Sequence, residues 1–198
     1  MFDHLWSWLV RLLIGASIAT TATTMAPTTS APYVATTIES HVAEAPALGR
    51  LMEFIDFDAE ALLPGWTLSV TEDYPDRLGE TDCRARTVSV GLRSGQSDAE
   101  LAFTLAHEIG HAMDCELGAR GWNLDWRPTW LVARGFPEGH AWWPQRGTDD
   151  RLVGCGDFAE SFAVVVTGTP STTTQRRTWR GEPDATQVLM IRQAIEAL

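Results

Sequence analysis

Residues 97–118 read SDAELAFTLAHEIGHAMDCELG, and this stretch contains the best-defined structural element of the sequence. Ser97, with Glu100 three residues later, forms a capping box, in which each side chain satisfies a backbone N–H group at the start of a helix. Apolar residues then recur at helical spacing as far as Leu117, and Gly118 is suited to end the helix as its C-cap. The sequence therefore predicts one long helix over residues 97–117.

The middle of this predicted helix carries the motif His107-Glu108-Ile109-Gly110-His111. Residues four apart on a helix point the same way, so both histidines can place an imidazole nitrogen on one metal ion, with Glu108 beside it. A zinc ion held there with a third ligand leaves its fourth position to water, whose proton Glu108 can accept as general base. Chance alone gives such a motif about 0.01 times in a chain of this composition. The motif predicts one catalytic Zn²⁺ bound by His107 and His111.

A third zinc ligand has to come from another part of the chain. Metzincins supply it with a histidine six residues after the motif, and the leucine found there excludes that class. The acidic candidates lie in residues 154–163, GCGDFAESFA, where Asp157 and Glu160 are three residues apart. On a helix these two side chains share a face.

HEIGH followed by DFAESFA resembles the gluzincin peptidases, and among them the small secreted relatives of the anthrax lethal factor catalytic domain. The resemblance implies a second helix with two acids, one that binds zinc and another, one turn later, that orients a zinc-bound histidine. Glu160 matches the second acid, but the first falls on Gly156, which has no side chain. Two assignments stay open: Asp157 binds zinc while Glu160 orients the histidine, or Glu160 is itself the ligand.

The same resemblance implies two further parts of a peptidase site. One is a donor that stabilises the transition state, for which His140 is the candidate and Arg146 and Arg151 are alternatives. The other is an edge strand that holds an extended peptide by backbone pairing, and Thr87–Leu92 is the segment expected to form it.

The rest of the chain predicts a small sheet and further helices around the motif helix. Strands are expected at 66–70 and 87–92, and further helices are expected at 48–57, 129–134, 157–166 and 188–198. The five tryptophans of residues 119–153 are expected to complete the core. Together these elements predict an α+β fold: a small zincin-type metallopeptidase domain with a short sheet, the HExxH helix and a second metal-ligand helix.

The composition is that of a globular domain and argues against nucleic acid as a partner. Hydrophobic residues make up 44% of the 198 residues, which is enough for a packed core. The net charge is −11, and all 15 basic residues are arginines. An acidic chain without a basic cluster repels phosphate backbones, so nucleic acid is not expected as a partner.

The N-terminal residues indicate export. Residues 1–26 are predicted to be a signal peptide or a membrane anchor that tethers the chain, and residues 27–37 are a Thr/Ser/Pro-rich linker before a domain at 38–198. The protein is thus expected outside the cytoplasm, secreted or anchored. Three cysteines in an oxidising compartment predict one disulfide and one remaining thiol, with the pairing open.

These features predict an exported zinc-dependent peptidase, an endopeptidase rather than an exopeptidase, that hydrolyses peptide or protein substrates with Glu108 as general base. Two alternatives share the same zinc motif. The domain could be a zinc-binding structural or binding module without activity, because Gly156 replaces the usual ligand. It could also be a zinc hydrolase that acts on cell-wall peptides.

Overall fold

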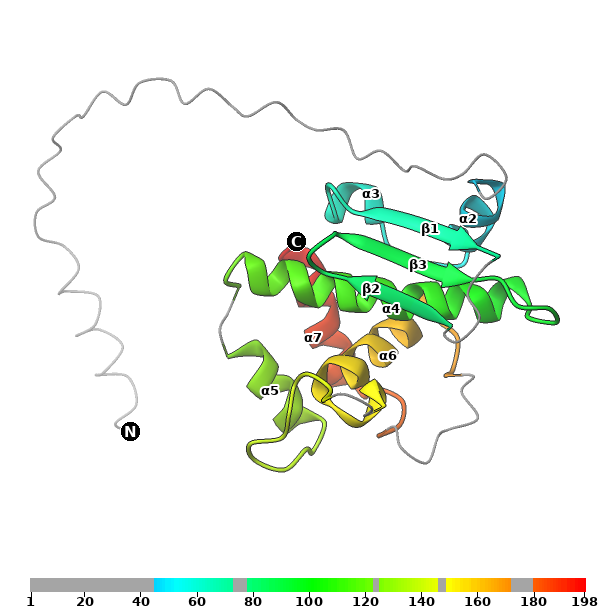
Figure 1. The fold of residues 1–198 in the computed structure, drawn as a ribbon. Coiled ribbons are helices and arrows are strands. Elements are labelled where there is room, and N and C mark those ends of the chain that lie inside the picture. Colours follow the sequence, from blue (N-terminus) through cyan, green and yellow to red (C-terminus); the bar gives the residue numbers. More distant parts are fainter. Residues whose placement is uncertain (1–44, 73–77, 123–124, 146–148, 172–179) are drawn as a thin grey trace, which may run out of the picture. The chain divides into compact units, whose positions relative to one another are not determined.

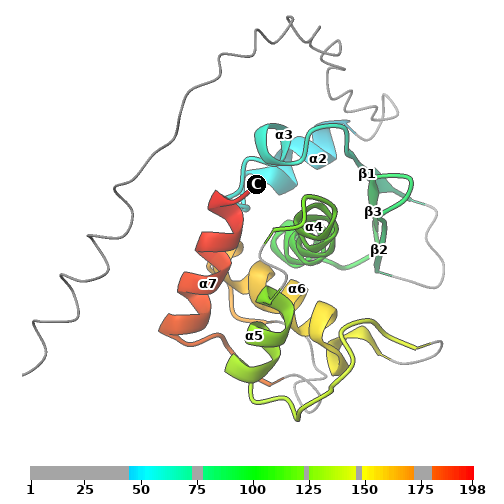
Figure 2. The same cartoon turned by 90° about the vertical axis from the view of Figure 1, so that its left-hand side faces the viewer.

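The longest helix of the described chain, α4 (Asp98–Ala119), lies between a small sheet on one side and helix α6 (Gly154–Thr167) on the other (Figures 1 and 2). The computed structural model describes residues 45–72, 78–122, 125–145, 149–171 and 180–198. The predicted signal or anchor segment, the linker and the start of the predicted domain fall outside these ranges. The described residues form an α+β fold with several helices and one three-stranded sheet.

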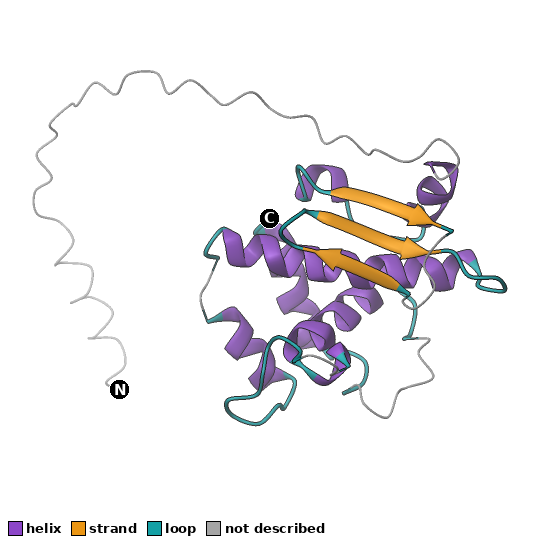
Figure 3. Ribbon diagram, viewed as in Figure 1, coloured by secondary structure: helices purple, strands orange, loops and turns teal. Residues whose placement is uncertain are grey.

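The sheet has the strand order β1-β3-β2, with β1 at Thr67–Thr71, β2 at Gly79–Asp82 and β3 at Thr87–Gly91 (Figure 3). Strands β1 and β3 are parallel, whereas β2 pairs antiparallel to β3. The two strands predicted from sequence are confirmed. The prediction that Thr87–Leu92 is an edge strand is wrong, because β3 is central and β2 takes the edge beside α4.

The remaining helices surround α4 and α6. They are α2 (Ala45–Met52), α3 (Ala59–Leu62), α5 (Trp126–Ala133), the 3₁₀ turn η1 (Asp150–Leu152) and α7 (Ala185–Glu196). Helix α2 packs against α4 and β1, while α5, α7 and η1 pack against α6. Figure 2 shows α4 end-on, with the sheet on one side and α5, α6 and α7 on the other.

Both ends of α4 follow from local chemistry. Ser97 is the N-cap and forms the predicted capping box with Glu100. The helix does not end at Gly118 as predicted but continues to Ala119, with Arg120 as the C-cap. Gly118 instead gives room to a neighbouring side chain, since a Cβ atom there would lie 2.8 Å from Nη2 of Arg127.

The close approach of α4 and α6 depends on Gly110, inside the histidine motif. A Cβ atom at this position would lie 2.8 Å from the Cα atom of Ala159. Such a distance is too short for two carbon atoms, so only glycine lets the helices pack this tightly. The motif glycine thereby brings α6 against the helix that carries the two histidines.

The core fills both sides of α4 and includes the tryptophans of α5. Trp126 and Trp130 are buried, and their rings contact Phe158 of α6 edge-on. Trp122 and Trp142 are partly buried against this core, whereas Trp143 is 46% exposed. The expectation that these tryptophans complete the core is confirmed for four of the five.

Cys83 and Cys115 form a disulfide, and Cys155 is a buried free thiol. This outcome confirms the expectation of one disulfide and one thiol. The bond joins the residue that follows β2 to the second half of α4. Among the described residues, we find no helix that combines the length and the apolar character needed to cross a membrane.

Candidate metal centre

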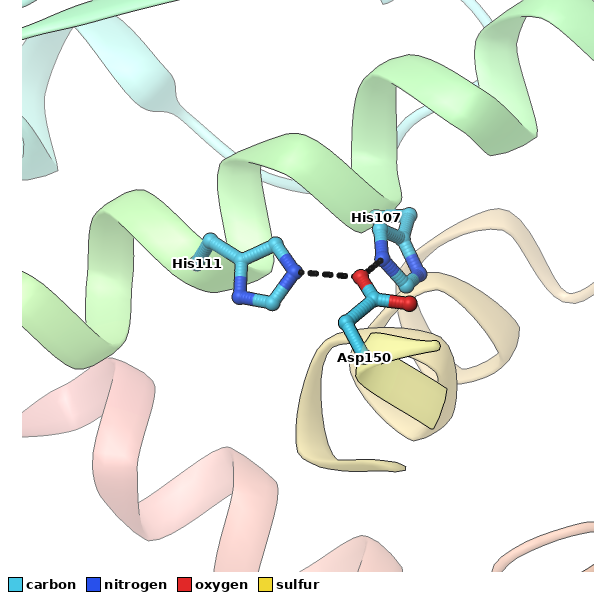
Figure 4. Close-up of side chains that lie close together, drawn as sticks. All are labelled: His107, His111 and Asp150. Atoms are coloured by element: carbon cyan, nitrogen blue, oxygen red, sulfur yellow. Dashed lines mark hydrogen bonds and ion pairs between the residues drawn. The ribbon is translucent and has the colours of Figure 1, made fainter. Parts of the chain in front are cut away.

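Two histidines of α4 and one aspartate of η1 converge on a single point. Nε2 of His107 lies 3.3 Å from Oδ2 of Asp150, and Nε2 of His111 lies 3.2 Å from the same oxygen. The three ligand atoms all lie within 4.8 Å of one another. In Figure 4 the two rings come from successive turns of α4 and face the carboxylate that rises from the η1 turn.

The donor set could hold a metal ion, and two of its three separations are close to those of a zinc site. Two imidazole nitrogens and one carboxylate oxygen are the ligands of many catalytic zinc sites. Zinc–ligand bonds of about 2.0–2.2 Å in a tetrahedron put the ligand atoms about 3.3–3.6 Å apart. The separations of 3.3 and 3.2 Å between the Nε2 atoms and Oδ2 are close to that edge length.

Asp150 reaches the histidines because Gly156 leaves space for the backbone of η1. A Cβ atom on Gly156 would lie 2.3 Å from the carbonyl carbon and oxygen of Asp150. Residue 156 is the position at which the gluzincin resemblance implies the first acid of the second helix. The turn that carries Asp150 therefore occupies the space that a side chain at 156 would need.

The turn itself is held by local bonds and by the preceding loop. Asp149 caps η1 by accepting a hydrogen bond from the backbone N–H of Arg151. The N–H of Gly154 and that of Cys155 donate to the carbonyls of Ala141 and Trp142. The loop before η1 thus pairs with the start of α6, which keeps Asp150 beside α4.

Glu160 contacts His107 on the side of the ring away from Asp150. Its Oε2 lies 2.9 Å from Nδ1 of His107, and Oε1 accepts a hydrogen bond of 2.5 Å from the hydroxyl of Ser171. A carboxylate that accepts from Nδ1–H fixes the tautomer in which Nε2 is free to bind a metal. This is the contact that the resemblance implies for the second acid, and Glu160 is only 2% exposed.

Charges around the two histidines favour a cation. Burial alone would lower the pKa of His107, but its hydrogen bonds with Asp150 and Glu160 raise that pKa to about 10. Burial likewise opposes ionisation of Asp150 and Glu160, yet their bonds to the imidazoles hold the pKa of each carboxyl below its ordinary value. Two carboxylates face His107, so positive charge is stabilised on this side of α4, whether a protonated imidazole or a metal ion carries it.

Asp157 lies elsewhere, in an ion pair under α5. Its Oδ2 accepts hydrogen bonds from Nε of Arg134 at 2.8 Å and from Nε1 of Trp130 at 3.0 Å, and its Oδ1 accepts from Nη2 of Arg134 at 2.9 Å. The side chain is fully buried. The structure therefore does not bring Asp157, one of the two predicted third ligands, to the histidines.

Glu108 lies on the sheet side of α4. Its Oε2 accepts a hydrogen bond of 2.7 Å from the hydroxyl of Thr81 on the edge strand β2. The residue is buried, and its negative charge is close enough to His107 to help raise the pKa of that ring. Glu108, the residue predicted to be a general base, therefore lies close to one of the two candidate histidine ligands.

The candidate transition-state donors have other partners in the structure. Nε2 of His140 lies 2.8 Å from the carbonyl oxygen of Leu152, and the ring stacks on Phe136. Arg151 forms two hydrogen bonds of 2.9 Å with Asp149. Arg146 lies outside the described residues.

Comparisons with protein-family models, with curated proteins and with solved structures find no match to this chain.

Sequence reasoning missed Asp150 because its role depends on tertiary packing. The residue begins the short 3₁₀ turn η1, far along the chain from α4, so no helical spacing relates it to His107 or His111. Gly156 is the one signal that points to it, since a missing side chain in the first turn of α6 makes room for a neighbouring segment. An acid that closely precedes such a glycine is then a candidate ligand.

Proposed function

We propose that the protein is a zinc-dependent peptidase with a zincin-like fold, in which His107, His111 and Asp150 hold the metal and Glu108 is the general base. The observation that carries the proposal is the convergence of two Nε2 atoms and one carboxylate oxygen within 4.8 Å of one another. The helix that carries both histidines also carries the buried Glu108. Zinc bound by such ligands acts as a Lewis acid and lowers the pKa of water to about 7.

Each residue of the site has a separate task in this proposal. Glu160 keeps His107 in the tautomer that binds metal through Nε2. Glu108 takes a proton from the attacking water and returns it to the amine that leaves when the peptide bond breaks. Asp150 supplies the negatively charged ligand that the resemblance would place at position 156, where this chain has glycine.

The edge strand β2 supports an extended peptide as substrate. The carbonyl of Leu78 accepts a hydrogen bond from the N–H of Gly91, which starts the antiparallel pairing with β3. Bonded pairs alternate along an antiparallel ladder, so Gly79 and Thr81 direct their backbone N–H and C=O groups to the outer edge. A substrate strand can pair there, next to Glu108, by β-strand addition.

The disulfide supports an extracytoplasmic location, secreted or anchored. Disulfides such as Cys83–Cys115 form and persist in oxidising compartments and are rare in the cytosol.

Zinc content and peptide cleavage by the full-length chain and its Glu108→Gln variant test this function. We expect about one zinc per chain in both proteins, because the mutated residue is not a ligand. Cleavage of fluorescein-labelled casein should fall about 10²–10⁴-fold in the variant, since the amide cannot accept a proton.

Several outcomes would contradict the proposal. Equal cleavage by the parental chain and Glu108→Gln would show that the activity belongs to a contaminant or to another site. Bound zinc without cleavage of any substrate would favour a non-catalytic module. Release of fragments from peptidoglycan but not from casein would assign the same site to cell-wall peptides.

A further inference from the structure

Thr81 of β2 makes a side-chain contact with the proposed general base. Its Oγ1 lies 2.7 Å from Oε2 of Glu108 and 2.9 Å from the backbone carbonyl oxygen of the same residue. A threonine hydroxyl has one hydrogen to donate, so these two oxygens of Glu108 share it. The hydroxyl therefore holds the carboxylate in a fixed orientation relative to its own helix turn.

Gly79 closes the other side of this position. A Cβ atom on Gly79 would lie 2.6 Å from Cγ and 2.8 Å from Oε1 of Glu108. The Glu108 side chain thus lies directly against the backbone of β2, between a residue without a side chain and one with a hydroxyl. We call this space, formed by Gly79 and Thr81, the β2 slot.

Two features hold β2 in place over α4. In the register with β3, Gly79 lies opposite Val90 and Thr81 opposite Val88, the two β3 residues that are buried toward the helix. The disulfide then joins Cys83, two residues after Thr81, to Cys115 of α4. The hydroxyl of Thr81 is therefore delivered to Glu108 by a strand that is bonded covalently to the same helix.

We propose that Thr81 is a positioning residue for Glu108, which it orients for proton transfer by holding Oε2 and leaving Oε1 to accept the proton. This inference rests on the proposed peptidase function. A flexible glutamate must be brought into line at every turnover, whereas a glutamate held in the β2 slot is oriented before substrate binds.

The test compares Thr81→Val, which removes the hydroxyl, with Thr81→Ser, which retains it. Thr87→Val is the matched control, because Thr87 lies on β3 with its side chain on the sheet face away from α4. Each full-length variant is assayed for zinc content, melting temperature, kcat and KM. The substrate is a quenched fluorescent peptide that spans the main casein cleavage site of the parental chain.

We expect kcat of Thr81→Val to fall about 10–100-fold, a loss of the size typical for residues that orient a group of the site without reacting themselves. KM, zinc content and melting temperature should change little, because β2 keeps its backbone and its disulfide. Thr81→Ser should recover most of kcat, and Thr87→Val should match the parental chain. Gly79→Ala, which fills the β2 slot, should also lower kcat.

The outcomes separate this inference from the function on which it rests. Parental kcat in Thr81→Val, or an equal loss in Thr81→Ser, would overturn the positioning role and leave the peptidase function standing. A loss in Thr81→Val that came with lost zinc or with raised KM alone would assign Thr81 to the metal site or to substrate binding instead. A parental chain that cleaves none of the peptides would overturn the proposed function and this inference together.

Discussion

Different contacts distinguish four acidic residues of the structure: Asp150, Glu160, Glu108 and Asp157. Asp150 faces the Nε2 atoms of both histidines, and Glu160 faces Nδ1 of one of them. Glu108 accepts from Thr81, whereas Asp157 is paired with Arg134. These contacts support a different proposed role for each acid: metal ligand, support of a ligand, general base and structural ion pair.

Asp150→Asn and Asp157→Asn should separate the proposed metal ligand from the structural acid. We expect Asp150→Asn to reduce zinc affinity by more than the roughly 10–100-fold typical of a supporting residue, because a charged ligand is lost. Asp157→Asn should retain its zinc affinity as long as it is folded. Competition with a chelator measures both affinities, and circular dichroism checks the fold.

The opposite order of affinities would return the ligand role to Asp157. Equal affinity in the parental chain and both variants would mean that neither acid binds the metal.

The sequence predicts those site residues that lie at regular spacing on one helix. His107, Glu108 and His111 follow from spacing on one helix, and the face shared by Asp157 and Glu160 follows in the same way. Spacing does not show that the Asp157 carboxylate pairs with Arg134 at the C-terminal end of α5. A buried arginine, distant in sequence, decides that orientation.

Among the elements, those with strong local signals were predicted and those without them were missed. The capping box of α4 and the β-branched residues of β1 and β3 determine these elements largely on their own. Strand β2 has the sequence GETD, which has no apolar residue and little strand propensity. Its pairing with β3 and the contact of Thr81 with Glu108 define it, and these are tertiary interactions.

Replacing Cys83 and Cys115 together by serine should weaken the attachment of β2 to α4. The disulfide closes a loop over a sequence separation of 32 residues. Loss of such a cross-link is expected to lower the free energy of unfolding by about 3–4 kcal/mol. Urea denaturation of the double variant measures the loss, and reduced parental protein is the control, because it should unfold at a similar urea concentration. Unchanged stability in both samples would show that the cysteines are not bonded in solution.

On the α6 side of the described fold, a polar network centred on Asp157 joins several helices. Arg134, the C-cap residue of α5, donates to Asp157, to Oε1 of Gln187 on α7 and to the carbonyl of Gly181. Gln187 also donates to the carbonyl of Ala133. One buried guanidinium therefore connects α5, α6 and α7. Helix α6 thus stabilises the fold through Asp157 and also contributes Glu160 to the candidate metal centre.

Arg134→Met should destabilise the whole fold, because it leaves the Asp157 carboxylate buried without its partner. Breaking a buried ion pair on one side costs about 3–5 kcal/mol. The double variant Arg134→Met/Asp157→Leu removes both charges and should lose less stability than Arg134→Met alone. Free energies of unfolding from urea titrations test this order. Additive losses in the double variant would show that the two residues stabilise the fold independently.

The relation between Gly156 and Asp150 restricts how such a site can change during evolution. An acid at position 156 and the η1 backbone need the same space, since the first Cβ atom would lie 2.3 Å from the carbonyl group of Asp150. In the proposed metal site, a chain with this backbone can take its third metal ligand from the η1 turn or from α6, but not from both. A lineage that exchanges an acid in the turn for an acid at position 156 therefore cannot pass through an ancestor that holds both acids at once. It must move the turn in the same step or spend an interval with a two-histidine site.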